Sequence, residues 1–194
     1  GVYLQQLVSF FMREETELDL QIFLNKRDAA NMIPQDVRGD SLVNLEIPSR
    51  NAPVRIFKEA ILWPKLLKQG HFDLFHSPMS YFPFAIPVSA VLTVHDLRSF
   101  HLDESYSIVR RTFLNQRIRS SVKTANHIIA ISRFTKDGIM DLFNVPSDRI
   151  SVIHEGIDVE RFRMPVDQQK WSAIQQRYGL PDDYILSVGH LEPR

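Results

Sequence analysis

The chain has 194 residues, equal numbers of acidic and basic side chains, and a 44% hydrophobic content. This balance is typical of a folded domain and carries no electrostatic signature of nucleic-acid binding, so we expect no nucleic-acid partner. The absence of cysteine excludes disulfides and thiolate-ligated metal sites and fits a cytoplasmic compartment, and no apolar run reaches the roughly 18 residues of a membrane-spanning helix.

The first seventy residues predict two helices and two strands. Apolar residues at helical or alternating spacing indicate a helix over residues 4–12, strands over 18–24 and 42–47, and a helix over 54–69. Pro64 inside the second helix should kink or split it, and Gly70 is a candidate C-cap.

Five short apolar runs that end in polar residues or glycine then follow, which is typical of buried parallel strands. They cover residues 72–75, 90–94, 127–131, 150–153 and 184–188. Four of the seven histidines follow such runs, either directly or after one glycine: His76, His95, His154 and His190. Because open α/β sheets bind ligands outside the carboxyl ends of their strands, these polar ends predict a site at one edge.

Helical patterns lie between these runs, at residues 105–124, 134–143 and 168–178. The alternation predicts an α/β fold with a Rossmann-like, mainly parallel sheet and helices on both faces. Ser132 is a candidate N-cap. The basic side chains of the helix at 105–124 form either a solvated face or a surface for anionic lipid or a phosphorylated acceptor; they are Arg110, Arg111, Arg117, Arg119 and Lys123.

Several chemistries lack their motifs. The sequence contains no Gly-x-Gly-x-x-Gly, no P-loop, no nucleophile elbow and no Asp-x-Asp. The histidines come from separate strands without a close pair, so we expect no metal or other cofactor. His95 could be a strand-end histidine with structural contacts alone, and capping alone could explain Ser132. The aromatic loop over residues 76–83 could stack on a sugar ring or pack internally.

Four stretches in order resemble the retaining glycosyltransferases of family four, which have the two-domain GT-B architecture. They cover residues 94–97, 125–136, 150–158 and 185–194. Glu155 stands where asparagine is commoner in that family, and His190 stands where arginine or threonine is frequent. The resemblance implies an acceptor-side domain over residues 1–157 without its first, central strand, a linker and helix over 158–183, and the first strand of a truncated donor domain over 184–194.

The resemblance also implies roles for individual residues. His95 would contact the transferred sugar near the reacting centre, where its imidazole or main-chain carbonyl stabilises developing positive charge, and Asp96 would orient this loop. The donor would contact Gly189 and Arg194, Gly1 would offer its amide to the diphosphate or the acceptor, and the acceptor pocket would be lined by His76, Ser77, Ser132 and Arg133.

The implied reaction moves a sugar from a nucleotide-diphosphate donor to a glycan or lipid-linked acceptor with retained configuration, in cell-surface polysaccharide synthesis. No protein nucleophile is expected, because the leaving diphosphate helps to deprotonate the acceptor. The 76–78 loop and the Arg-rich helix resemble bacterial mannosyl- and rhamnosyltransferases, which makes GDP-mannose the first donor to consider, with the protein at the inner face of the membrane. The alternatives are a nucleotide-sugar epimerase of the same fold, for which Asp96 and Glu155 are the rim acids, and a non-catalytic sugar- or nucleotide-binding half-module.

Overall fold

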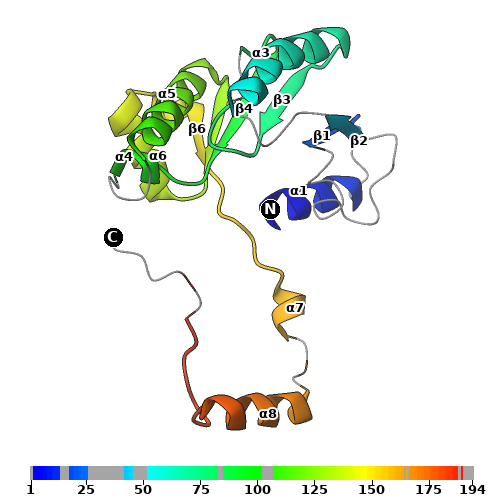
Figure 1. Ribbon diagram of the computed structural model, residues 1–194, viewed down its shortest axis with the longest axis vertical. Coiled ribbons are helices and arrows are strands. Elements are labelled where there is room, and N and C mark those ends of the chain that lie inside the picture. The colour runs from blue at the N-terminus through cyan, green and yellow to red at the C-terminus, as the bar shows by residue number, and fades with distance from the viewer. Residues whose placement is uncertain are drawn as a thin grey trace. The chain divides into compact units, whose positions relative to one another are not determined.

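The computed structural model describes most of the chain (Figure 1). The described residues are 2–13, 18–25, 42–45, 52–82, 85–101, 107–163, 165, 167–187 and 189. The chain divides into two compact units, Gly1–Glu155 and Gly156–Arg194.

All described strand pairs are parallel, which confirms the predicted α/β class. One sheet pairs β1 (Ile22–Asn25) with β2 (Leu42–Leu45). The other has four strands in sequence order: β3 (Leu74–Ser77), β4 (Ser89–Val94), β5 (His127–Ala130) and β6 (Ile150–Val152). The described strands thus form two sheets rather than one, and the break falls between β1 and β3.

Strand β4 is buried on both faces, as its continuous apolar run predicts. Leu92, Thr93 and Val94 are each 0% exposed. Because successive side chains of a strand point to opposite faces, Leu92 and Val94 belong to the main core and Thr93 faces the other side of the sheet.

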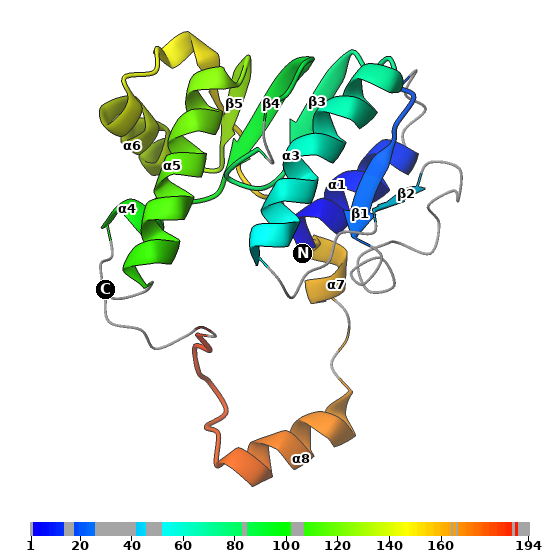
Figure 2. The same cartoon turned by 45° about the horizontal axis from the view of Figure 1, so that its top comes forward.

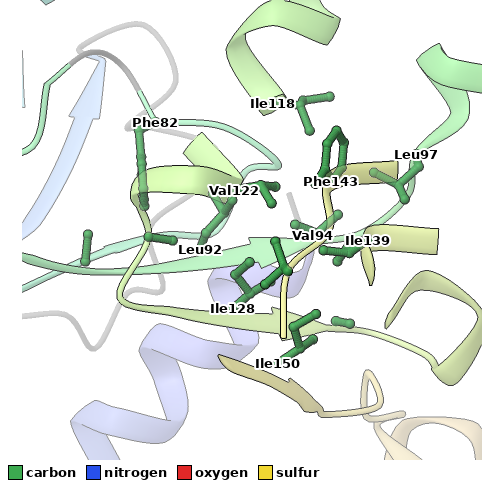
Figure 3. Close-up of a cluster of buried hydrophobic side chains, with 14 residues drawn as sticks. Phe82, Leu92, Val94, Leu97, Ile118, Val122, Ile128, Ile139, Phe143 and Ile150 are labelled. Carbon is green, nitrogen blue, oxygen red and sulfur yellow. The ribbon is translucent and has the colours of Figure 1, made fainter. Parts of the chain in front are cut away.

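Helices pack along the four-stranded sheet (Figure 2). On one face, α5 (Ile108–Thr124) and α6 (Arg133–Phe143) add four side chains to the core around β4 and β5, namely Ile118, Val122, Ile139 and Phe143 (Figure 3). The long α3 (Ala52–Gln69) adds Trp63, whose ring meets that of Phe75 from β3 edge-on at 5.4 Å. On the opposite face, α1 (Val2–Arg13) brings the Tyr3 hydroxyl within 3.3 Å of Thr93 Oγ1.

Helix α6 begins as predicted. The Ser132 hydroxyl accepts a hydrogen bond from the Thr135 amide at 3.1 Å, which confirms the N-cap. The helix ends at Asn144, whose left-handed backbone (φ 54°) returns its amide to the Met140 carbonyl.

Several predicted elements differ from the structure. The strand predicted over residues 18–24 is observed at Ile22–Asn25. The strand predicted over residues 72–75 is observed at Leu74–Ser77, because hydrogen bonding to β4 sets its register; His76 and Ser77 therefore lie inside it. Helix α3 is not split at Pro64, since the buried Leu67 (1% exposed) anchors the turn that follows the proline. The loop predicted after β4 contains the short α4 (Arg98–His101).

The second unit contains α7 (Val159–Arg163), where a linker was predicted, and α8 (Gln168–Tyr178), which has the predicted bounds. Asp167 caps α8 through the amides of Gln169 and Lys170. The strand predicted over residues 184–188 does not form in the described part, Tyr184–Ser187. A strand requires a hydrogen-bonded neighbour, and no described strand pairs with this segment; Ile185 is 99% exposed. No described helix of either unit is long and apolar enough to cross a membrane.

Candidate functional site

The carboxyl ends of the four parallel strands bring the predicted polar residues to one edge of the sheet. Ser77 ends β3, and His95 and Asp96 follow β4. Ser132 and Arg133 follow β5 after one residue, and His154 and Glu155 follow β6 in the same way. His154 links two of these ends, because its Nδ1 lies 3.0 Å from the Ile131 carbonyl oxygen.

His95 contacts three other segments at this edge. Its Nδ1 lies 2.9 Å from Oε1 of Glu155, and its Nε2 lies 2.9 Å from the carbonyl oxygen of Pro78. Its amide donates to the Ser80 hydroxyl at 3.4 Å, and the Tyr3 ring meets the imidazole at 87° with 5.0 Å between centroids. The imidazole is therefore held by the segments that follow β3 and β6 and by α1.

The two polar partners of the His95 ring limit its chemistry. The Pro78 carbonyl only accepts hydrogen bonds, so the contact at Nε2 takes a proton on that nitrogen. Nδ1 is engaged with the Glu155 carboxyl group. While both contacts last, both ring nitrogens are occupied by atoms of the protein.

His76 lies on the sheet face opposite the main core. Its Nε2 is 2.8 Å from Thr93 Oγ1, the same hydroxyl that Tyr3 approaches. Burial lowers the pKa of His76 from its ordinary 6.5, because desolvation penalises the charged ring. A polar connection therefore runs inside the fold from His76 through Thr93 to Tyr3, whose ring packs on His95.

Three of the predicted site residues have clear local contacts. Ser77 is buried, and its hydroxyl donates to the carbonyls of Met79 at 3.2 Å and Tyr81 at 2.9 Å, which shapes the loop that carries Pro78. Asp96 Oδ1 accepts from the Arg98 amide at 3.0 Å and thereby holds the turn into α4. Ser132 caps α6, while the Arg133 side chain that follows it is exposed.

Three predicted site residues lie outside the described part of the first unit. Gly1 and Arg194 lie outside the described residues. Gly189 belongs to the second unit, and a Cβ built on it meets no atom within 4 Å. Among the described residues no group of three His, Asp or Glu gathers as metal ligands.

The predicted basic face of α5 is smaller than its sequence indicates. Arg117 is only 9% exposed, donates to the Phe82 carbonyl and lies over the Tyr81 and Phe113 rings at 5.3 and 5.7 Å. Desolvation by burial lowers its pKa. Its guanidinium supports the loop after β3 from inside, whereas Arg110, Arg119 and Lys123 are exposed.

Sequence reasoning missed the residues that hold His95. No sequence motif includes Tyr3, Thr93 or the Pro78 carbonyl. Thr93 carried a weak signal, since a lone hydroxyl inside an apolar strand needs a buried partner. Glu155 was noted only as a rim acid and a departure from a family pattern, and its pairing with His95 spans 60 positions.

Comparison with known sequences identifies similar proteins. The sequence profile described as Glycosyltransferase Family 4 matches residues 1–161. The chain is 29% identical over 150 residues to O-antigen chain mannosyltransferase B of Escherichia coli, covering 75% of this chain and 39% of that protein. It is 30% identical over 98 residues to O-antigen chain mannosyltransferase RfbU of Salmonella typhimurium, covering 50% and 24%, and 26% identical over 112 residues to the serotype-specific mannosyltransferase WbdA of Escherichia coli, covering 56% and 14%.

Among solved structures, a glycosyltransferase from Rickettsia africae is similar with a TM-score of 0.42 and 17% identity, over 73% of this chain and 37% of that one. The chain thus spans less than two fifths of the length of each protein that it matches here.

Proposed function

Because the chain belongs to glycosyltransferase family 4, we propose that it serves to move a sugar, mannose first of all, from a nucleotide-diphosphate donor to a glycan or lipid-linked acceptor in the synthesis of a surface polysaccharide. The observation that carries this proposal is the family match over residues 1–161. Three similar proteins are named mannosyltransferases, two of them of O-antigen chains, which supports mannose and a polysaccharide product.

We further propose GDP-mannose as the donor and retention of configuration at the transferred carbon. The acceptor oxygen bonds to the anomeric carbon while the bond to the diphosphate breaks, and the departing diphosphate takes the acceptor proton on the same face. No metal and no other cofactor is required in this scheme. The protein's task is to position donor and acceptor and to stabilise developing charge.

In this proposal His95 stands beside the reacting centre. Both nitrogens of its ring have acceptor partners, which favours its main-chain carbonyl as the group that faces the developing positive charge on the sugar. Asp96 holds the turn that follows. Ser77, His76, Ser132 and Arg133 line or support the acceptor pocket, and the amide of Gly1 meets the diphosphate or the acceptor, with Gly189 and Arg194 on the donor side.

We also propose that the protein works in the cytoplasm at the inner face of the membrane. The first turn of α5 exposes Ile108 (77%) and Val109 (81%) directly before the basic Arg110. Apolar side chains beside cations are the combination that favours a peripheral contact with anionic lipid.

The structure gives no support to the epimerase alternative. An epimerase of this architecture would need two acids available at the rim. The Glu155 carboxylate is paired with His95, and that of Asp96 accepts from the Arg98 amide.

The experiment that tests the function is mannose transfer by the full-length protein from labelled GDP-mannose to lipid-linked oligosaccharides, with the anomeric configuration of the product read by NMR. We expect a retained configuration, and a fall of about 10- to 100-fold in turnover for His95→Ala. His127→Ala is the matched control, because His127 begins β5 at the other end of the sheet. The proposal is wrong if the protein transfers sugar from no nucleotide sugar, or if His95→Ala has the same turnover as the wild type.

A further inference from the structure

Glu155 contacts the His95 ring directly, with its Oε1 at 2.9 Å from Nδ1. Its carboxylate arrives from the segment after β6, while the Pro78 carbonyl arrives from the segment after β3. The two acceptors lie on different ring nitrogens. Rotation of the imidazole out of its present orientation therefore breaks both hydrogen bonds together.

A third contact restricts the same ring. Tyr3 meets the imidazole at 87°, and its hydroxyl lies 3.3 Å from the buried hydroxyl of Thr93. Thr93 is 0% exposed and sits inside β4, two residues before His95. The aromatic contact is thus anchored to the sheet, and Glu155 supplies the charged contact of the set.

The pair has little value for stability as such. The His95 and Glu155 side chains are 30% and 43% exposed, so water screens their attraction. Exposed pairs of this kind contribute little to folding, but a charge-assisted hydrogen bond still fixes direction. Orientation is therefore the property to which Glu155 contributes most.

We propose that Glu155 is a positioning residue for glycosyl transfer, which acts through His95 by fixing its imidazole at the carboxyl edge of the sheet. This inference rests on the proposed function for its catalytic consequence. The held ring ties the backbone of His95, with its main-chain carbonyl, to the segments that follow β3 and β6. The ring nitrogens stay engaged with Glu155 and Pro78. The proton of the acceptor hydroxyl leaves with the diphosphate.

The first test reads the orientation without any reaction. In the full-length protein, the ring protons of Tyr3 and His95 should show a nuclear Overhauser effect, assigned by its loss in His95→Ala. Glu155→Ala should weaken or abolish this signal, and Glu155→Gln, which still offers an acceptor oxygen, should keep it. A signal unchanged in Glu155→Ala overturns the positioning role.

The second test measures the effect of Glu155 on the rate of sugar transfer. We expect Glu155→Ala to lower kcat by about 10- to 100-fold with little change in KM for the donor, because misplacement of a group near the reacting centre costs rate rather than binding. Glu155→Gln should recover most of that loss. The matched control is Asp141→Asn, which removes an exposed carboxylate from α6 and should turn over as the wild type does.

A double variant separates action through His95 from an independent role. His95→Ala combined with Glu155→Ala should be no slower than His95→Ala alone. A further fall means that Glu155 acts elsewhere and overturns the proposal. If Glu155→Ala fails to fold, Glu155→Asp replaces it, because its carboxylate stands on a side chain one methylene shorter. A loss of the Overhauser effect and of kcat in Glu155→Asp then supports the proposal, and values equal to those of the wild type overturn it. If the wild type transfers no sugar, the proposed function fails while the Overhauser arm still decides whether Glu155 holds His95.

Discussion

His76 Nε2 lies 2.8 Å from the hydroxyl oxygen of Thr93, across the parallel pair β3 and β4. The Tyr3 hydroxyl reaches the same oxygen from α1 at 3.3 Å. One buried hydroxyl thus joins two strands and a helix on the sheet face behind His95.

Thr93→Val removes this hydroxyl while keeping the shape of the side chain. We expect the free energy of unfolding to fall by about 1 to 2 kcal/mol, because His76 and the Tyr3 hydroxyl both lose a hydrogen-bond partner in a partly buried place. Urea denaturation measures the change. Thr93→Ser, which keeps the hydroxyl, should retain the bond to His76, and a Thr93→Val protein as stable as the wild type would contradict this account.

The pKa of His76 predicts how stability depends on pH. Since burial lowers this pKa below 6.5 in the folded state, the unfolded chain takes up a proton first as the pH falls through 6.5. The unfolded state then binds more protons, so the free energy of unfolding rises with pH in this window and falls toward acid. Urea titrations on both sides of 6.5 should show a smaller slope in His76→Gln than in the wild type. An identical slope would show that other groups carry the dependence.

Ser132→Ala removes the hydroxyl that caps α6. The Thr135 amide then loses its acceptor, and we expect the free energy of unfolding to fall by about 1 kcal/mol. Ser132→Asn, whose side chain can also accept from that amide, should restore most of the loss in thermal or urea denaturation. If alanine and asparagine behave alike, the cap contributes nothing to stability.

Gly138 lets α6 approach the loop that carries His95. A Cβ at this position would lie 3.0 Å from Cδ1 of Leu97, a buried residue two positions after His95. Gly138→Leu should therefore destabilise the protein by about 1 to 3 kcal/mol through overpacking, measured by urea denaturation. Gly156→Ala is the control, because a Cβ there meets no atom within 4 Å and should change stability little.

The sequence by itself determined the local elements and their order. Apolar periodicity indicated α8, most of α6 and the strands β4 to β6 nearly to the residue, because burial of one stripe or one run is a local pattern. It also determined the cap at Ser132, since the hydroxyl of a serine before an amphipathic run bonds to an amide only three residues further on. Parallel strands in turn implied that His95 and Glu155 would lie at the same edge of the sheet.

Only the tertiary structure decided which side chains meet there. The register of β3 against β4 placed His76 inside a strand and against Thr93. Packing under the loop after β3 buried Arg117, although the sequence of its helix predicts a basic, exposed face. The partners of His95 come from positions 3, 78 and 155. Contacts between residues so far apart in the chain depend on strand order and on how helices cross the sheet. The residue spacing within a single segment determines neither.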